Sequence, residues 1–332
     1  MKTNNPGVLT LGQTAHFLKK HDDYLILTHA SPDGDTLGGA FTLAAGLRKI
    51  GKKCRILCPD PIPDKYGFFT EKIPQSDGND GKTVISVDVA DLQLLGKLRE
   101  SYEGNIVLCI DHHVSNTLYA ENTYLDAAAS ASCESVYELL KKMRIPLDVF
   151  MAAALFTGIA TDTGSFKYAN VTSKTHRIAA DLYTYPIHAD EISRRMFDTK
   201  SRNRLELERM VLDGAKFYFS GRCIVLTVTT QMQAETGCTD SDLEGVAVIS
   251  RSVEGVLAGV SIKQKGPDLY KISLRTYDPL NASEICKKLG GGGHKGAAGC
   301  QMTGSLEEIT QKILEQIGNA LEECHAGNSA AE

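Results

Sequence analysis

The first 110 residues contain four short apolar runs that alternate with stretches of helical character, and this alternation restricts the fold more than any other feature. The runs occupy residues 24–27, 54–58, 83–87 and 106–110. Apolar residues recur with helical spacing over 9–20, before the first run, and over 36–50, after it. Strands that alternate with helices form parallel sheets through right-handed crossovers. We therefore predict an α/β fold whose N-terminal part is a parallel sheet with helices on both faces.

Clusters of polar residues directly follow three of the predicted strands. The heptapeptide HASPDGD (29–35) follows the first strand, Asp88 follows the third, and the tripeptide DHH (111–113) follows the fourth. Ligands of parallel sheets bind beyond the carboxyl ends of the strands. We therefore expect the three clusters to meet at one edge of the sheet.

The residue types in these clusters are typical of a site for hard divalent cations, which bind carboxylate oxygens and accept some imidazole nitrogens. Within HASPDGD, Pro32 and Gly34 favour a turn that can direct alternate side chains inward. A fourth segment, TDTG (161–164), interrupts the helical pattern of residues 131–185 and adds a carboxylate. Two cations about 3.5–4 Å apart can activate a water molecule and relieve charge on a phosphate ester. The pattern therefore indicates metal-dependent hydrolysis of phosphate esters.

Each segment also has a structural interpretation when it is taken alone. Pro-Asp-Gly is a common surface turn, Asp88 suits the N-cap of a helix, and Gly164 suits a helix C-terminus. Three adjacent ionisable groups in DHH are costly to bury without partners, which favours a functional role. The coincidence of four such segments favours a metal site over four unrelated structural roles.

A chain of 332 residues is long enough for two domains, each with its own apolar core. We expect the first domain to span 1–187 and the charged helical stretch 188–215 to be a solvated connector. Residues 217–229 and 256–274 resemble antiparallel strand pairs, and 305–323 resembles a helix. We predict a smaller mixed α/β domain over 216–325 and a frayed tail over 326–332.

A glycine-rich segment, GGGGHKGAAG (290–299), is the candidate phosphate clamp of the second domain. Glycines allow backbone amides to approach an anion closely, and His294 and Lys295 add donors at the same place. The Ala-Ala that follows indicates the start of a helix. Arg275, at the end of a predicted strand, is a second candidate because its guanidinium can grip a phosphate with two hydrogen bonds. The structural alternative for the glycine-rich segment is a flexible linker, and the alternative for Arg275 is an exposed arginine at the rim without a ligand.

The overall composition excludes several classes of protein. Lys and Arg total 36 against 41 Asp and Glu, a formal net charge of −5, which argues against coating long nucleic acid. The nine cysteines show no paired CxxC spacing and are expected to be reduced. No segment resembles a secretion signal or a membrane span. We expect a cytoplasmic protein without a membrane partner.

The four polar segments resemble, in order and spacing, the motifs of the DHH phosphoesterase superfamily, and GGGGHKGAAG resembles the signature of its companion DHHA domain. The likeness covers nearly the whole chain. The extension from DHH to Ser115 and Asn116 is most similar to NrnA-type enzymes. Those enzymes degrade RNAs of a few nucleotides and remove the 3′ phosphate of the adenosine bisphosphate pAp. Gly39 departs from the motif, which often has Ser there, and we expect this to affect helix packing rather than metal binding.

The resemblance implies a role for each residue of the site. One cation would be held by His29 and Asp33, the second by Asp35, His112 and Asp162, and Asp88 would bridge them. Asp111 would orient a ligating imidazole, and His113 would stabilise the scissile phosphate or assist the leaving oxygen. Manganese is the expected ion, with magnesium or cobalt as alternatives. The residues assigned to substrate binding are Asn116, Arg275, Gly291, Gly292, Gly293, His294 and Lys295.

Several related activities share these metal motifs. Cyclic or linear dinucleotide phosphodiesterases, pyrophosphatases, exopolyphosphatases and RecJ-like nucleases are the alternatives, although the acidic balance disfavours a long polyphosphate channel. A non-catalytic nucleotide-binding module would have lost some ligands, and none is missing here. The expected partner is a short single-stranded RNA or a nucleotide, because a clamp on a separate domain leaves room for only a few nucleotides. The resemblance is also compatible with a homodimer.

Overall fold

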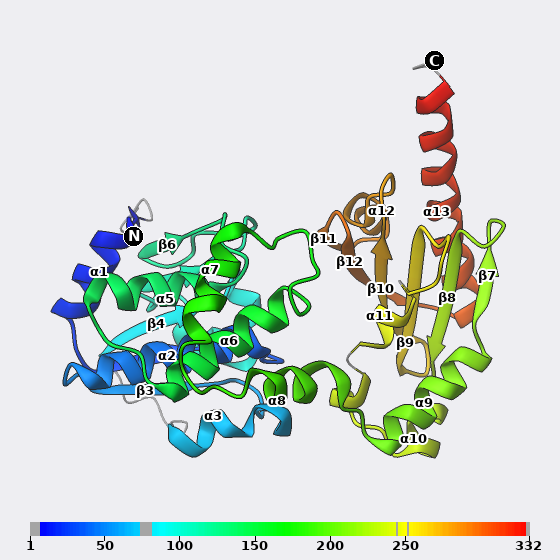
Figure 1. The fold of residues 1–332 in the computed structure, drawn as a ribbon. Coiled ribbons are helices and arrows are strands. Elements are labelled where there is room, and N and C mark those ends of the chain that lie inside the picture. The colour runs from blue at the N-terminus through cyan, green and yellow to red at the C-terminus, as the bar shows by residue number, and fades with distance from the viewer. Residues whose placement is uncertain (1–6, 74–81, 244, 251, 330–332) are drawn as a thin grey trace. The chain divides into compact units, whose positions relative to one another are not determined.

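The computed structural model describes residues 7–73, 82–243, 245–250 and 252–329. The chain forms two compact units, Met1–Thr199 and Lys200–Glu332, coloured from blue to green and from green to red in Figure 1. Among the described residues, no helix is both long and apolar enough to cross a membrane.

The first unit contains a six-stranded sheet in the order β1-β6-β5-β4-β2-β3, and every neighbouring pair is parallel. Its strands are β1 (Gly7–Val8), β2 (Tyr24–Leu27), β3 (Cys54–Leu57), β4 (Thr83–Val87), β5 (Leu108–Asp111) and β6 (Asn122–Leu125). The predicted parallel sheet is confirmed. Two strands were not expected from the sequence: β1, which has two residues, and β6, whose NTYL mixes polar and apolar side chains.

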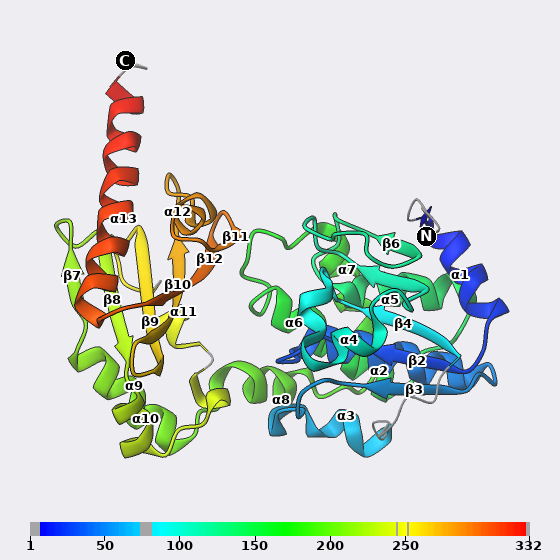
Figure 2. The same ribbon diagram turned by 180° about the vertical axis from the view of Figure 1, so that it is seen from behind.

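Helices cover both faces of this sheet, as predicted, but unequally. Alternate strand residues point to opposite faces, and Ile26 and Leu27 accordingly belong to different apolar clusters. The larger cluster is formed with helices α1 (Leu11–Lys20), α2 (Gly34–Lys49), α3 (Gly67–Lys72), α5 (Ser132–Met143), α6 (Val149–Asp162) and α7 (Ser173–Leu182). The smaller cluster is closed by two short helices, η2 (Leu92–Leu98) and α4 (Arg99–Tyr102), of which α4 is labelled in Figure 2.

The stretch 188–215, expected to be a solvated connector, is instead divided between the two units. Helix α8 (Ala189–Ser193) and the π-helical turn η3 (Arg194–Asp198) pack on the first core, while α9 (Arg202–Asp213) belongs to the second unit. Leu207 and Val211, four residues apart on α9, are fully buried. This narrow apolar stripe lies among many charged residues, which concealed it in the sequence.

The second unit contains a mixed six-stranded sheet in the order β11-β12-β10-β9-β8-β7, antiparallel except for the parallel pair β8 and β9. Its strands are β7 (Lys216–Tyr218), β8 (Cys223–Val228), β9 (Ala258–Gly266), β10 (Leu269–Thr276), β11 (Gly292–His294) and β12 (Ala297–Thr303). The two predicted antiparallel pairs, β7 with β8 and β9 with β10, are confirmed.

The described part of the second unit has five helical segments besides α9: α10 (Thr230–Thr236), η4 (Asp240–Leu243), α11 (Val246–Ile249), α12 (Ala282–Lys288) and α13 (Leu306–Ser329). The isoleucines Ile309, Ile313 and Ile317 of α13 are buried at helical spacing and pack in the core of the unit. Helix α13 continues through residues 326–329, where a frayed tail was predicted, and residues 330–332 lie outside the described part of the chain.

The glycine-rich segment is not a helix entry, so that prediction is wrong. It follows α12 and forms the hairpin of β11 and β12. A Cβ atom on Gly291 would collide with the carbonyl oxygen of Gly299, and one on Gly293 would lie 2.6 Å from the carbonyl oxygen of Ala297. Gly293 also has a positive φ of 145°, a backbone conformation that favours glycine. The glycines therefore permit close packing of backbone in a hairpin.

Candidate active site

The order of strands in the first sheet determines where the polar segments meet. Strands β5, β4 and β2 are adjacent, and the chain leaves β2 toward β3 on one side and β4 toward β5 on the other. Such a switch in direction opens a crevice at the carboxyl ends of the strands. The structure brings residues 29–35, Asp88 and residues 111–113 together there, and the end of α6 adds Asp162.

His29, Asp33 and Asp88 form one group of three side chains that could hold a cation. The Nε2 atom of His29 lies 3.5 Å from Oδ1 of Asp33 and 3.6 Å from Oδ2 of Asp88, while its Nδ1 lies 2.8 Å from the carbonyl oxygen of Ala30. Burial opposes the charged form of His29, but the adjacent carboxylates of Asp33 and Asp88 raise its pKa to about 11. A bound cation would take the place of that proton.

Asp33 also begins helix α2, so the structural interpretation of its turn holds as well. Its Oδ1 accepts hydrogen bonds from the backbone N–H groups of Asp35 at 3.0 Å and Thr36 at 3.1 Å. Burial would raise the pKa of Asp33, but the adjacent imidazole of His29 and these backbone donors lower it to about 2. The N-cap therefore fixes the carboxylate in its charged form beside His29.

Asp35, His112 and Asp162 form a second group. The Nε2 atom of His112 lies 3.5 Å from Oδ2 of Asp162, 3.8 Å from Oδ2 of Asp35 and 3.6 Å from Oδ1 of Asp88. The two oxygens of Asp88 thus face different groups, Oδ2 toward His29 and Oδ1 toward His112.

The chemistry of this second group fits a cation. The Nδ1 atom of His112 lies 3.2 Å from the carbonyl oxygen of Ala129 and can donate its proton there, which leaves a lone pair on Nε2. Within the described ranges that buried Nε2 has no hydrogen-bond partner. Burial, followed by the charge of Asp88, raises the pKa values of Asp35 and Asp162 well above their usual range. Divalent cations would satisfy the nitrogen and neutralise the buried carboxylates.

Asp35 is held by the start of helix α5. Its Oδ2 accepts a hydrogen bond from the backbone N–H of Ser132 at 2.6 Å, and its Oδ1 accepts one from that of Cys133 at 2.9 Å. These N–H groups have no acceptor within their own helix, and the helix N-terminus favours negative charge. Helices α2 and α5 are therefore joined through a ligand carboxylate.

The close packing behind Asp35 depends on Gly158 of α6. A Cβ atom at this position would collide with Sγ of Cys133 and would lie 3.0 Å from Oδ1 of Asp35. We expect Gly158→Ala to lower the free energy of unfolding by about 1–3 kcal/mol because the packed core must shift. Urea unfolding of the metal-free protein measures this.

Gly12 of α1 provides a matched control, because a Cβ atom there would lie 3.8 Å from Cε of Lys142, an ordinary contact. Alanine is a better helix former than glycine, so Gly12→Ala should be neutral or slightly stabilising. Equal unfolding midpoints for the two variants would contradict the packing argument.

Asp111 is fully buried and receives several hydrogen bonds. Its Oδ1 accepts from the backbone N–H of His112 at 2.8 Å and from Nδ1 of His113 at 2.8 Å, and its Oδ2 accepts from Nδ2 of Asn116 at 2.6 Å. Burial would raise the pKa of Asp111, but the contact with His113 lowers it. Burial opposes the charge of His113, but Asp111 raises its pKa to about 9. Asp111 therefore contacts the side chain of His113 rather than that of His112.

Asn116, assigned to the substrate from the sequence, has its amide group engaged within the protein. Its Nδ2 donates to Asp111, and its Oδ1 accepts from the backbone N–H of Leu118 at 2.8 Å. The structure places it behind Asp111, where it fixes the carboxylate that holds His113.

The other predicted substrate residues gather in the second unit. Arg275 pairs with Ala297 in the register of β10 and β12, and the N–H of Thr276 donates to the carbonyl oxygen of Gly296. Lys295 is exposed, with its Nζ 2.7 Å from Oδ1 of Asp278. Gly292 and Gly293 are exposed, and the side chain of His294 lies outside what the structure describes. The end of β10 and the glycine-rich hairpin therefore lie side by side.

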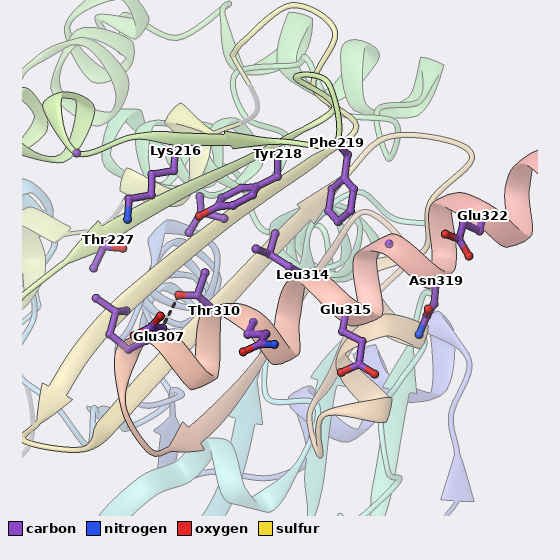
Figure 3. A pocket seen from close by; sticks show the side chains of 15 residues that line it. Lys216, Tyr218, Phe219, Thr227, Glu307, Thr310, Leu314, Glu315, Asn319 and Glu322 are labelled. Atoms are coloured by element: carbon purple, nitrogen blue, oxygen red, sulfur yellow. Dashed lines mark hydrogen bonds between the residues drawn. The ribbon is translucent and has the colours of Figure 1, made fainter.

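The second unit also contains a cavity of about 930 Å³ between α13 and strands β7 and β8 (Figure 3). Lys216, Tyr218 and Phe219 line it from the sheet side, and Leu314 and Glu315 line it from the helix. Among the side chains that the structure describes, none of the predicted site residues belongs to this lining.

Comparisons with known proteins agree with the division of the chain into two units. The N-terminal domain of the DHH family matches residues 23–159, and the DHHA1 domain matches residues 221–323. A Thermus thermophilus protein named bifunctional oligoribonuclease and PAP phosphatase NrnA is 30% identical over 305 residues, 89% of each chain.

Solved structures show the same fold. An exopolyphosphatase-related protein from Bacteroides fragilis, 24% identical, covers 94% of this chain and 95% of its own with a TM-score of 0.80. RecJ from Thermus thermophilus in complex with Mn²⁺, 16% identical, covers 96% of this chain and 56% of its own with a TM-score of 0.57. The chain therefore belongs to the DHH family and carries a DHHA1 domain in its second unit.

Proposed function

We propose that this chain is a manganese-dependent phosphoesterase that hydrolyses short oligoribonucleotides to mononucleotides and removes the 3′ phosphate of pAp. The observation that carries the proposal is the pair of neighbouring three-residue groups, one that contains Asp88 and a second whose His112 lies 3.6 Å from the other oxygen of Asp88. The relative from Thermus thermophilus, similar over 89% of both chains, is named for these two activities.

The donor set favours manganese over magnesium. His29 and Asp33 would hold one cation, Asp35, His112 and Asp162 the other, and Asp88 both. Imidazole beside carboxylates suits manganese better than magnesium, which prefers oxygen and retains its water. RecJ from Thermus thermophilus was solved with Mn²⁺ and also with Mg²⁺. Magnesium and cobalt remain the alternative ions.

The cations, when bound, supply an activated water and neutralise charge on the phosphoryl oxygens. The protein's own residues orient the remaining groups. Asp111 holds Nδ1 of His113 at 2.8 Å and is itself held by Asn116, so the ring of His113 is fixed. Its Nε2 is then available to bind the scissile phosphate or to give a proton to the departing ribose oxygen.

We assign residues 1–187 to catalysis and residues 216–325 to substrate binding. In the second unit, Arg275, Lys295 and the N–H groups of the glycine-rich hairpin would contact the phosphates of the substrate. The nine cysteines are all free thiols, as expected for a reducing cytoplasm, which is the location we propose.

A side-by-side substrate assay tests the proposal. With Mn²⁺ present, kcat/KM for pAp and for a 5′-phosphorylated diribonucleotide should exceed that for pyrophosphate by at least about tenfold, a difference of about 1.4 kcal/mol in transition-state binding. A cyclic dinucleotide and a 20-nucleotide RNA complete the panel, and chelation followed by addition of Mn²⁺ is the control. Preference for pyrophosphate, the cyclic dinucleotide or the long RNA would refute the proposed substrate class.

A further inference from the structure

Ser132, which no sequence motif marks, contacts two of the carboxylates assigned to the cations. It is the first residue of α5 and is fully buried. Its backbone N–H donates to Oδ2 of Asp35 at 2.6 Å, and its hydroxyl donates to Oδ1 of Asp88 at 2.9 Å. One residue therefore links the segment after β2 to the segment after β4.

Ser132 and the three site histidines all approach the Asp88 carboxylate. The contact from the Ser132 hydroxyl is the shortest of the four. Nε2 of His29 and Nε2 of His112 lie at 3.6 Å, and Nδ1 of His113 lies at 3.5 Å. The Nδ1 atom of His113 is directed to Asp111 instead, at 2.8 Å. Of these four groups, the Ser132 hydroxyl is therefore the one that is close enough to restrain the Asp88 carboxylate by a hydrogen bond.

Rotation of this carboxylate matters because its two oxygens face different ligand groups. The terminal torsion of an aspartate side chain has a broad energy profile, so rotamer preference alone does not fix it. The hydrogen bond from Ser132 restrains Oδ1 on the side of His112 and leaves Oδ2 on the side of His29.

We propose that Ser132 is a positioning residue whose hydroxyl sets the orientation of Asp88 between two bound cations. This inference rests on the proposed function, because it assumes a centre with two cations. Partners that orient metal ligands typically contribute about 10–100-fold to metal affinity. Loss of the Ser132 hydroxyl therefore weakens binding of one of the two cations and removes the close coupling between them.

The test is Ser132→Ala, which deletes the contact with Asp88 but keeps the backbone N–H that holds Asp35. Ser135 provides a matched control: it lies on the same helix and is fully buried, and its Oγ has no hydrogen-bond partner in the described part of the chain. The metal-free proteins are titrated with Mn²⁺ alone by calorimetry, and electron paramagnetic resonance reports the coupling between two bound ions.

We expect Ser135→Ala to bind two coupled Mn²⁺ ions as the unmodified protein does. In Ser132→Ala, the weaker ion should bind about 10–100-fold less tightly, with loss of the coupled spectrum. Ser132→Cys offers a weaker donor of similar size and should give intermediate affinity. With this variant, the role of the hydroxyl can still be tested if the alanine variant unfolds.

The positioning role would be overturned if Ser132→Ala and Ser132→Cys both bound two coupled ions as tightly as Ser135→Ala does. The proposed function is assessed separately by diribonucleotide hydrolysis with the unmodified protein. A protein that binds two coupled ions and depends on Ser132 for this, but does not hydrolyse the diribonucleotide, retains the inference and loses the proposed function.

Discussion

Asp88→Asn should lower kcat/KM for manganese-dependent diribonucleotide hydrolysis by at least about a thousandfold, because metal catalysis contributes several kcal/mol and each 1.36 kcal/mol is a factor of ten. The Asp88 carboxylate lies between both ligand groups, with Oδ2 3.6 Å from His29 and Oδ1 3.6 Å from His112. An amide keeps one oxygen but loses the negative charge. Initial rates at saturating Mn²⁺ measure the effect.

Asparagine is the suitable replacement because the backbone of Asp88 has a positive φ of 63°. Asn and Asp tolerate this left-handed conformation better than other residues with side chains. The remaining oxygen of Asn can still accept the hydrogen bond from Ser132. The variant therefore tests the charge of Asp88 and not its backbone.

Stability measurements separate loss of cation binding from damage to the fold. In the metal-free protein, burial and the charge of Asp88 raise the pKa values of Asp35 and Asp162. Removing one negative charge from this cluster should leave the metal-free variant at least as stable as the unmodified protein. Mn²⁺ should raise the Tm of the unmodified protein by binding the native state, and this rise should be largely lost in the variant.

Asp23→Asn is the matched control. Asp23 also has a positive φ, of 54°, and its Oδ1 lies 2.7 Å from Nη2 of Arg55 in a partly buried ion pair away from the ligand groups. This variant should keep both its turnover and its stabilisation by Mn²⁺. Near-normal turnover of Asp88→Asn beside a normal control would refute the bridging role.

The sequence predicted the parallel sheet because four of its strands are short apolar runs buried in a two-sided core. The runs over 24–27 and 83–87 coincide with β2 and β4. Strand β6 escaped prediction because NTYL has no clear alternation and is defined by its parallel partners β5 and β1. Pairing across the sheet, which local sequence does not express, creates such strands.

The ligand segments were predictable for a related reason: each follows an element whose end the sequence marks. The contacts that hold the ligand side chains in place could not be predicted. Ser132 is an ordinary serine at the start of a predicted helical stretch, and only the packing of α5 against α2 brings it to Asp35 and Asp88. The glycine-rich hairpin was mistaken for a helix entry because its close approaches involve Gly299 and Ala297, on a strand that the sequence did not indicate.

His113 is the side chain best placed for a role other than metal binding. Its ring is held by Asp111 at Nδ1, it belongs neither to the group of His29, Asp33 and Asp88 nor to that of Asp35, His112 and Asp162, and its side chain is 29% exposed. It also lies in a third possible ligand group with Asp88 and His112. A variant must therefore distinguish an action on the phosphate from cation binding.

We expect His113→Ala to lower kcat for diribonucleotide hydrolysis by at least about 100-fold, the usual contribution of a positioned acid or base, while two coupled Mn²⁺ ions remain bound. His16→Ala, at an exposed position on α1, is the control and should be unaffected. If His113 protonates the leaving oxygen, a p-nitrophenyl ester of a nucleoside 5′-monophosphate should lose much less activity, since its leaving group needs no proton. If His113 stabilises phosphoryl charge, both substrates should lose activity equally. A decrease below about tenfold with the diribonucleotide, or loss of the coupled manganese signal, would contradict a catalytic role separate from metal binding.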